Sequence, residues 1–298
     1  MRYFIISILS FLICQNNFDE NKAFQLVLDQ CSIGPRYPGS KGHSECKNFI
    51  INNLLQYSDD VVVDSHVIED PLTRDSVNIH NIFYRFNPNR DNRILLIAHW
   101  DTRRYADMDP DSLNHKKPVI GANDGASGVA VLLTILDQLN KNNLDNIGVD
   151  FLFADAEDMG VYGKPDTWAI GSRLFSENYP TILPHFGICV DMVADKELEI
   201  EIEKHSYQMA PSLVNYIWNI AKDNNYDNIF KSQLGAAIID DHVSFSMATG
   251  IPSIDIIDLD YIYWHTIKDI PENISKSSLD VVGTVLTEFI YKYDADIK

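Results

Sequence analysis

Four apolar segments of this chain lead into carboxylate or imidazole side chains, and this pattern most constrains the fold. The segments read RILLIAH (93–99), VDFLFAD (149–155), FGICVDM (186–192) and IPSIDIIDL (251–259). Each is apolar through its middle, as is typical of a strand in the centre of a sheet that is covered on both faces. Because helical patterns separate the segments, the sequence predicts an α/β protein with a mostly parallel central sheet.

The remaining segments complete this alternation. Two further segments, 61–67 and 77–86, are rich in β-branched and aromatic residues, which indicates strands. Helices are expected near residues 22–31, 42–56, 210–223 and 275–291, and a long one after Asp124. We therefore predict one three-layer α/β/α domain over residues 18–298, with a mixed, mostly parallel sheet.

The length and charge of the chain limit what it can bind. With 298 residues, of which 45% are hydrophobic, it can bury one large core. It carries 43 acidic against 24 basic residues and a net charge of -19. Such a surface repels phosphate backbones, so we expect no nucleic-acid partner.

The first 17 residues resemble a signal peptide. Arg2 precedes an apolar run from Tyr3 to Ile13, which is too short to span a bilayer, and polar residues end it abruptly. Cys14 stands where a lipoprotein would be lipidated, although Ile13 occupies a position that normally holds a small residue. We expect export to the periplasm or a lipid-anchored place in the cell envelope, with secretion as an alternative. A buried N-terminal strand or helix is the other interpretation.

Three cysteines remain beyond this segment. An odd number cannot form a complete disulfide framework, although Cys31 could pair with Cys46. Cys189 lies in an apolar run and is expected to be a buried thiol.

Polar residues gather where the predicted strands end. In open α/β sheets, ligands bind beyond the carboxyl ends of the strands. His99, Glu157-Asp158, Asp191 and His265 all follow predicted central strands, and Asp124 lies where the long helix begins. The Asn-Asp-Gly sequence around Asp124 is also turn chemistry, in which an aspartate can cap the helix that follows. We expect Asp124 to do both, starting the helix and offering its carboxylate to a metal.

Three of these residues could form a catalytic zinc site. Such a site uses three protein ligands and leaves one position open, and Asp124, Asp158 and His265 meet this need. Glu157, next to Asp158, could act as a general acid/base beside the metal. Each residue alone has a purely structural interpretation, but their conjunction favours a metal site.

The motifs AHWDT, GANDGASGV, DAED, VDMVAD, DDHVSF and YWHT occur in the order found in the zinc aminopeptidase-like superfamily. In detail the chain resembles glutaminyl-peptide cyclotransferases (glutaminyl cyclases), particularly the bacterial type, and GPRYPGS resembles their N-terminal segment. The resemblance implies that Asp124, Asp158 and His265 bind one zinc ion and that Glu157 is the general acid/base. Many relatives carry Glu where this chain has Asp158.

The resemblance also implies how substrate is held. Asp191 and Asp240 match two acids that form a hydrogen-bonded pair beside the substrate, and Trp264 and Trp168 match indoles of the substrate pocket. The implied reaction converts the N-terminal glutamine of peptides or proteins to pyroglutamate and releases ammonia. We expect no contact with membranes except through the signal peptide or a lipid anchor.

Two alternatives stay open. In a two-zinc aminopeptidase of the same superfamily, His99 and Asp191 would bind a second ion, with Asp124 bridging the two metals. Asp240 as a partner for Asp191, and Trp264 directly before His265, favour the cyclase. A non-catalytic binding module is the other alternative, because a fold does not fix a function. Such a module is expected to have lost metal-ligating residues, whereas this chain has one at every ligand position.

Overall fold

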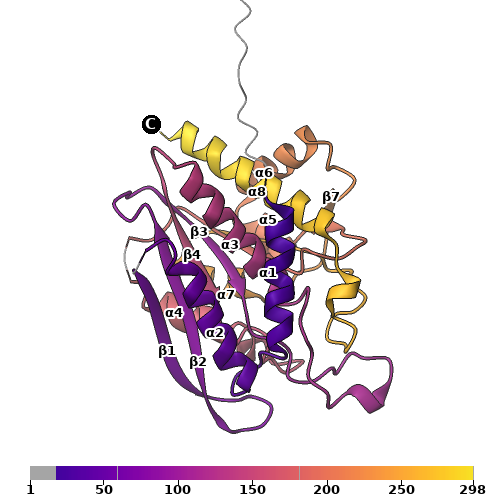
Figure 1. Cartoon of the computed structure of the whole chain (residues 1–298). Helices are drawn as coiled ribbons and strands as arrows, with labels where there is room; N and C mark the ends of the chain where they lie inside the picture. The colour runs from indigo at the N-terminus through magenta and orange to yellow at the C-terminus, as the bar shows by residue number, and fades with distance from the viewer. Residues whose placement is uncertain (1–17, 59, 181, 298) are drawn as a thin grey trace, which may run out of the picture.

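The computed structural model describes residues 18–58, 60–180 and 182–297, so the predicted signal peptide and Cys14 lie outside the described residues. A six-stranded sheet runs through the molecule in the order β1-β2-β4-β3-β5-β8 (Figure 1). Neighbouring pairs among β4, β3, β5 and β8 are parallel, whereas β1 and β2 pair antiparallel, as do β2 and β4. The strands are β1 (Val61–Glu69), β2 (Ser76–Phe86), β3 (Arg93–His99), β4 (Gly148–Ala154), β5 (Gly187–Asp191) and β8 (Ser253–Ile257).

The burial of each strand follows its sequence. Every residue of β3, β4, β5 and β8 is buried, as expected for strands covered on both faces. β1, at the edge of the sheet, instead alternates between half-buried and exposed positions along much of its length. The predicted mixed, mostly parallel sheet is therefore confirmed.

Helices cover both faces of this sheet (Figure 1). The larger hydrophobic core packs α1, α2, α3 and α8 against one face, and a second cluster joins α4 and α7 to the other face. This is the predicted three-layer α/β/α arrangement. The helices are α1 (Glu20–Ile33), α2 (Lys41–Leu54), α3 (Ala126–Lys141), α4 (Ile170–Glu177), α5 (Lys204–Met209), α6 (Pro211–Asp223), α7 (Asp241–Thr249) and α8 (Lys276–Asp296). β6 (Ile200–Ile202) and β7 (Phe230–Leu234) form a small separate parallel sheet.

The start of α3 differs from the expectation. Its N-cap is Gly125, with φ 98° and no side-chain hydrogen bond, so the expected capping role of Asp124 is wrong. A Cβ atom at Gly125 would lie 2.4 Å from the backbone oxygen of Asp101, which explains why a glycine stands there. The side chain of Asp124 is thus left free to point into the interior, toward His99 and His265.

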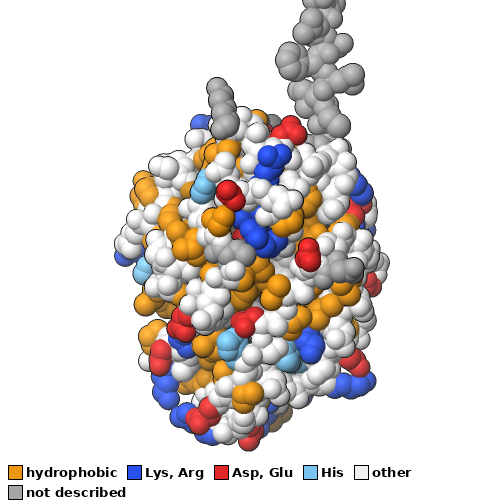
Figure 2. Space-filling view, turned by 90° about the vertical axis from the view of Figure 1, so that its left-hand side faces the viewer, with side chains coloured by type: hydrophobic (Ala, Val, Ile, Leu, Met, Phe, Trp, Pro, Cys, Tyr) orange, Lys and Arg blue, Asp and Glu red, His pale blue; other side chains and the backbone are white. Residues whose placement is uncertain are grey.

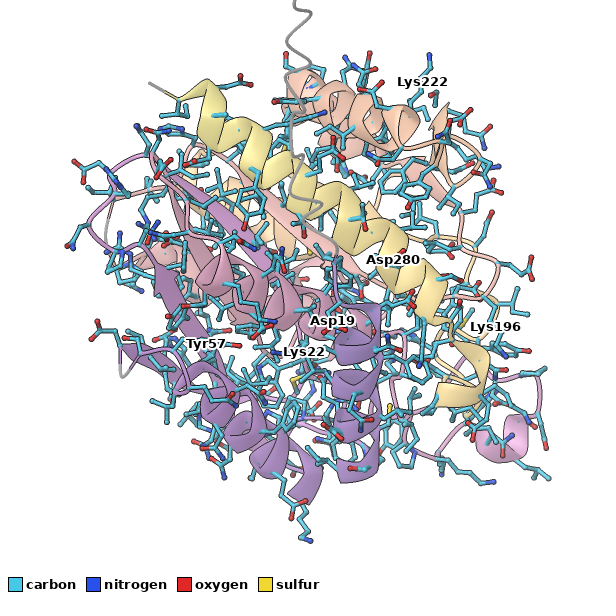
Figure 3. The ribbon with its side chains drawn as sticks, turned by 45° about the horizontal axis from the view of Figure 1, so that its top comes forward. Asp19, Lys22, Tyr57, Lys196, Lys222 and Asp280 are labelled. Atoms are coloured by element: carbon cyan, nitrogen blue, oxygen red, sulfur yellow. The ribbon has the colours of Figure 1, made fainter. Side chains whose placement is uncertain are left out.

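Polar contacts link α1 to α3 on the face of the sheet that both helices cover. Asp19 caps α1, and Lys22, one turn further, lies 2.7 Å from the carboxylate of Asp137 on α3 (Figure 3). Tyr57 donates a hydrogen bond of 2.8 Å to the same carboxylate. The two helices are therefore linked by charge as well as by their apolar contacts.

The cysteines and the surface complete the description. Cys31, Cys46 and Cys189 are free thiols, so the expected option of a Cys31–Cys46 disulfide is not realised. Among the described residues, no helix has the length and apolar character needed to cross a bilayer. Figure 2 shows charged side chains of both signs interspersed with apolar ones on the face that it presents.

Candidate active site

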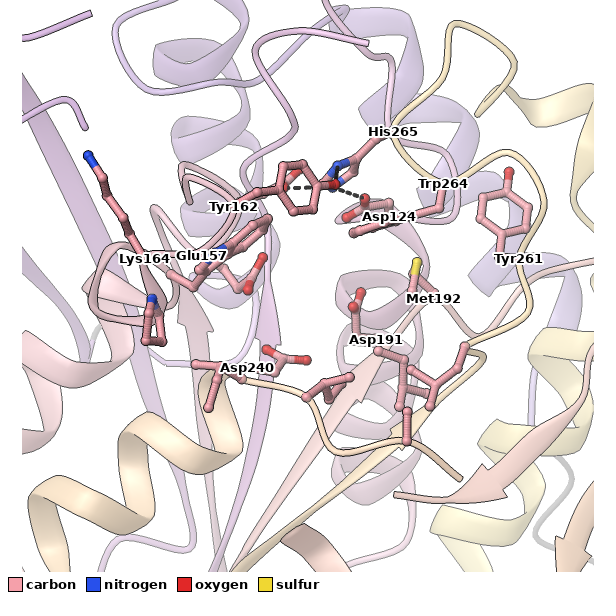
Figure 4. Close-up of a pocket in the computed structure, with 18 of the residues that line it drawn as sticks. Asp124, Glu157, Tyr162, Lys164, Asp191, Met192, Asp240, Tyr261, Trp264 and His265 are labelled. Atoms are coloured by element: carbon pink, nitrogen blue, oxygen red, sulfur yellow. Dashed lines mark hydrogen bonds and ion pairs between the residues drawn. The ribbon is translucent and has the colours of Figure 1, made fainter. Parts of the chain in front are cut away.

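The carboxyl ends of β5 and β8, the loop after β4, the segment before α7 and the turn before α3 surround one pocket of about 530 Å³ (Figure 4). This volume lies in the usual range for small-ligand sites. Of the residues predicted for the site, all but His99 line this pocket: Asp124, Glu157, Asp158, Trp168, Asp191, Asp240, Trp264 and His265. Separate loops at one edge of the sheet thus meet where the sequence placed a ligand site.

The three candidate zinc ligands lie together in the wall of the pocket. Nε2 of His265 lies 2.9 Å from Oδ1 of Asp158 and 3.6 Å from Oδ2 of Asp124. One ligand atom from each of the three residues falls within 4.8 Å of the others, and all three residues are buried.

The bonding of these carboxylates tests whether they fit a metal. Oδ2 of Asp124 and both carboxylate oxygens of Asp158 are buried, and within the described residues they make no well-formed hydrogen bond, although the imidazole of His265 lies close to both acids. Buried carboxylate oxygens are normally hydrogen-bonded unless they have another role. Two acids and one imidazole also form a donor set that zinc accepts, with room for a further ligand. The residues present therefore fit the ion.

His99 forms a second group with two acids. Its Nε2 lies 3.0 Å from Oδ1 of Asp191 and 3.2 Å from Oδ1 of Asp124. Because His99 is 1% exposed, these contacts are shielded from water. Burial opposes the charged form of His99, but the negative charge of Asp191 and the hydrogen bonds that the imidazole donates to neighbouring acids raise its pKa well above the usual value. In the absence of a cation, a protonated His99 would balance the charge of the two acids.

Glu157 lies in the same pocket, in a strongly acidic environment. Its carboxylate points into the cavity, as do those of Asp191 and Asp240 (Figure 4). Burial, and then the negative charge of Asp240, raise the pKa of Glu157 well above its usual value. A carboxyl group with a raised pKa can both hold and release a proton near neutral pH, as a general acid/base must.

Asp191 and Asp240 do not contact each other through a hydrogen bond within the described ranges. Asp191 instead contacts His99, and Oδ1 of Asp240 accepts a hydrogen bond from the backbone N–H of Asp241 at the start of α7. Oδ2 of Asp240 has no partner there and is buried. Both carboxylates still line the pocket, so the implied pair beside the substrate stays a prediction.

Aromatic side chains form one wall. The rings of Trp264 and His265 stack with centroids 3.9 Å apart, and Trp168 lies parallel to His265 with centroids 6.1 Å apart. Tyr162 packs edge-on against both indoles. The structure therefore brings both predicted tryptophans to the pocket, with a tyrosine that the sequence did not single out.

Arg103 and Asp107 support the candidate ligands, and sequence reasoning missed both. Arg103 donates hydrogen bonds to the backbone oxygens of Asp158 and Gly160 and to the carboxylate of Asp107. Oδ1 of Asp107 lies 3.4 Å from Nδ1 of His265, on the side of the ring away from the candidate metal position. Hydrogen bonds from His265 and Arg103 hold the pKa of Asp107 well below its usual range, although burial opposes this.

Asp101 is a second support. It accepts hydrogen bonds from the backbone N–H groups of Glu157, at 3.0 Å, and Asp158, at 3.2 Å. Its position two residues after His99 was a usable signal, because the motif AHWDT was already part of the resemblance. Arg103 had no comparable signal, since only the fold brings it beneath Asp158.

The backbone is strained at several points of the site. His265 itself has φ 53°, Ala156 before Glu157 has φ 57°, and Met192 after Asp191 has φ 49°. Non-glycine residues seldom adopt this left-handed conformation, and such residues cluster at functional sites. Sharp turns directly beside the pocket residues thus aim their side chains inward.

The profile of Peptidase family M28 matches residues 81–290. The chain belongs to this family. The solved structure of the glutaminyl cyclase of Bacteroides thetaiotaomicron is similar, with 35% identity, a TM-score of 0.89, and coverage of 92% of this chain and 98% of that one. The solved structure of a Zn-dependent exopeptidase from Parabacteroides distasonis is as similar, with 34% identity, a TM-score of 0.89 and the same coverage.

A curated relative extends the similarity beyond bacteria. The glutaminyl-peptide cyclotransferase of Bos taurus is 24% identical over 87% of this chain and 78% of its own length. The resemblance to glutaminyl cyclases within the M28 family is therefore confirmed, as is the enzyme class that the sequence implied. The similar exopeptidase is zinc-dependent, and Asp124, Asp158 and His265 of this chain form a donor set that zinc accepts.

Proposed function

We propose that this M28 chain is a one-zinc glutaminyl cyclase that converts the N-terminal glutamine of peptides or proteins to pyroglutamate. The observation that carries the proposal is the pocket itself. In it, the ligand set Asp124, Asp158 and His265 adjoins a buried Glu157 and an indole wall. The similarity to solved glutaminyl cyclases over nearly the whole chain supports the same activity.

Asp124, Asp158 and His265 would hold the ion. When bound, zinc supplies a Lewis acid that polarises the side-chain carbonyl of the substrate glutamine. The ion would balance the charge of the two buried acids, Asp124 and Asp158, so we expect the three residues to bind it as a unit.

Glu157 would move the proton. It takes a proton from the substrate's own α-amine, whose nitrogen forms a bond to the side-chain carbonyl carbon and closes a five-membered ring. Glu157 then gives the proton to the amide nitrogen as the bond between carbon and nitrogen breaks, and ammonia leaves. The raised pKa of Glu157 suits both halves of this exchange.

The other pocket residues would orient the substrate. Asp191 and Asp240 offer carboxylates that can hold the amine and the leaving nitrogen, and Trp264 and Trp168 cover the site against water. Because attack is intramolecular, the pocket mainly has to fold the substrate into a reactive conformer.

The two-zinc aminopeptidase is the second candidate, and one observation favours it. His99, Asp124 and Asp191 place three ligand atoms within 4.8 Å of one another, as a second metal site would require. The exopeptidase from Parabacteroides distasonis, whose structure is similar, is a peptidase. Against it, Trp264 and Trp168 crowd the space beside His265, which suits a small side chain better than a peptide bond.

One experiment separates the two. Purified protein lacking residues 1–17 is incubated with a short peptide that begins with glutamine, and the products are followed by mass spectrometry. Loss of one ammonia with the chain intact, abolished by a chelator and restored by zinc, supports the cyclase. Release of free glutamine would instead establish the aminopeptidase.

We also propose that the protein is exported through residues 1–17, to the periplasm or to a lipid-anchored place in the envelope. The support is the sequence pattern around Tyr3–Ile13 and Cys14. Intact-mass measurement of protein from the cell envelope would show removal of the segment or a lipid on Cys14. An unprocessed N-terminus would contradict export.

A further inference from the structure

A single buried carboxylate, that of Asp269, holds the backbone of the turn that carries Asp124. The N–H of Asn123 donates to Oδ1 of Asp269 at 2.8 Å, and the N–H of Asp124 donates to Oδ2 at 3.1 Å. Asp269 is fully buried and Asp124 is 3% exposed. Both carboxylate oxygens are thus used to fix two consecutive peptide units, which sets the direction in which the Asp124 side chain leaves the turn.

The same segment supplies another candidate ligand. Asp269 follows His265 by four residues, and its own N–H donates to the backbone oxygen of Thr266. The backbone oxygen of Asp269 accepts a hydrogen bond from the N–H of Ala122 at 3.4 Å. One short turn therefore connects the backbone of His265 to that of Asp124, although the two lie far apart in the sequence.

Tyr261 joins this unit to the wall of the pocket. Its hydroxyl donates a hydrogen bond of 2.8 Å to Oδ1 of Asp269, and its ring lines the pocket beside Met192 and Ile257. Asp101 makes the equivalent backbone contacts to Glu157 and Asp158 on the other side of the site. Each aspartate of the candidate ligand set is therefore held through its backbone by a buried carboxylate.

We propose that Asp269 is a positioning residue for the metal site, which fixes Asp124 relative to His265 so that both reach the same zinc ion. This rests on the proposed zinc site but not on the cyclisation reaction. Partners behind the ligands of a metal site typically change metal affinity about 10–100-fold when removed. Asp269 holds the backbone of Asp124 and not its side chain. Because the backbone sets the direction of that side chain, we expect a loss of zinc affinity of the same order.

The test is the affinity for zinc without any peptide, measured by competition with a chromophoric chelator, together with the absorption spectrum of the cobalt-substituted protein. In Asp269→Asn, the amide nitrogen faces a backbone N–H that previously donated to oxygen, so we expect zinc to bind about 10–100-fold more weakly. The ligand-field bands of the cobalt protein should shift as well. Tyr261→Phe removes only one donor and should weaken zinc binding less.

Asp258→Asn is the matched control. Asp258 is also a buried aspartate in the segment after β8, and its Oδ1 accepts a hydrogen bond from the N–H of Asp260, but it does not line the pocket. Its variant should change neither the zinc affinity nor the cobalt spectrum.

Unchanged zinc affinity in Asp269→Asn would overturn the proposal, as would an equal loss in Asp258→Asn. If Asp269→Asn does not fold, the zinc affinity of Tyr261→Phe is the test. Weaker binding than in the unaltered protein would then support the proposal, and equal binding would overturn it. Since no substrate is present, these outcomes are independent of whether the enzyme makes pyroglutamate.

Discussion

Oδ1 of Asp158 lies 2.9 Å from Nε2 of His265, although one residue follows β4 and the other follows β8. Both are buried, and contacts with Asp158 and Asp107 help to raise the pKa of His265 to about 9 against the opposing effect of burial. A zinc ion between them would need the neutral imidazole, so metal binding and proton release are coupled.

The first prediction concerns this pair. Asp158→Asn should lower zinc affinity by more than the roughly 10–100-fold typical of an outer partner, since it removes a ligand charge. Zinc retained after dialysis, measured by atomic emission, checks this. Asp166→Asn, on the exposed part of the same loop, is the matched control and should retain its zinc. Equal retention by both variants would contradict the ligand assignment.

Glu157→Gln tests the proton-transfer role. The change is nearly isosteric but removes the group that exchanges the proton, so kcat should fall about 10²–10⁴-fold while KM changes little. Zinc content and melting temperature should stay near those of the unaltered protein. A variant that keeps zinc and more than a tenth of the original kcat would show that another group moves the proton.

Two side chains compete for the outer nitrogen of His265. Asp107 lies 3.4 Å from its Nδ1, and the hydroxyl of Tyr162 lies 3.3 Å from the same atom. Because the carboxylate is also held by Arg103, we expect it to be the partner that orients the ring. Asp107→Asn should therefore weaken zinc binding about 10-fold or more, whereas Tyr162→Phe should leave zinc affinity nearly unchanged. The reverse order would assign the orienting role to Tyr162.

The environment of Glu203 predicts how the stability of the fold depends on pH. It accepts hydrogen bonds from the backbone of His205, Ser206 and Ile238 and contacts Nε2 of His242 at 3.1 Å. Burial opposes its ionisation, but the hydrogen bonds from His242 and the backbone lower its pKa from 4.5 to about 2. A carboxyl group whose pKa is lower in the folded state stabilises the fold above its unfolded pKa.

This stabilisation is therefore complete above about pH 4.5 and is lost as the pH falls toward 2. Glu203→Gln should lower the free energy of unfolding by about 2 kcal/mol at pH 7, as for loss of a charged hydrogen-bond acceptor. The difference between the two proteins should shrink steadily below pH 4.5. Denaturant unfolding at several pH values checks this, and a difference independent of pH would refute the assignment.

The sequence predicted the parts of this molecule that depend on local patterns. The mostly apolar runs of β3, β4, β5 and β8 identified a buried parallel sheet, and the rule for strand ends located the pocket. The role of Asp124 as a helix cap was wrong because the φ of Gly125 turns the chain before α3 begins. Only the backbone conformation could reveal this.

Contacts between distant segments were beyond the reach of the sequence. Arg103 reaches Asp158, and Asp269 reaches Asp124, only because the loops after separate strands converge at one edge of the sheet. An arginine or aspartate in a loop is ordinarily exposed to solvent, so the residue type alone does not indicate that the side chain is buried. The supporting residues of a metal site are for this reason harder to find than its ligands.

The number of metal ions tests the central claim most directly. A crystal of the zinc-loaded protein, measured at wavelengths above and below the zinc absorption edge, locates each ion by its anomalous difference density. The one-zinc cyclase predicts a single peak bounded by Asp124, Asp158 and His265, with His99 and Asp191 in contact with each other. A second peak of comparable height between His99, Asp124 and Asp191 would contradict it and establish the two-zinc peptidase site.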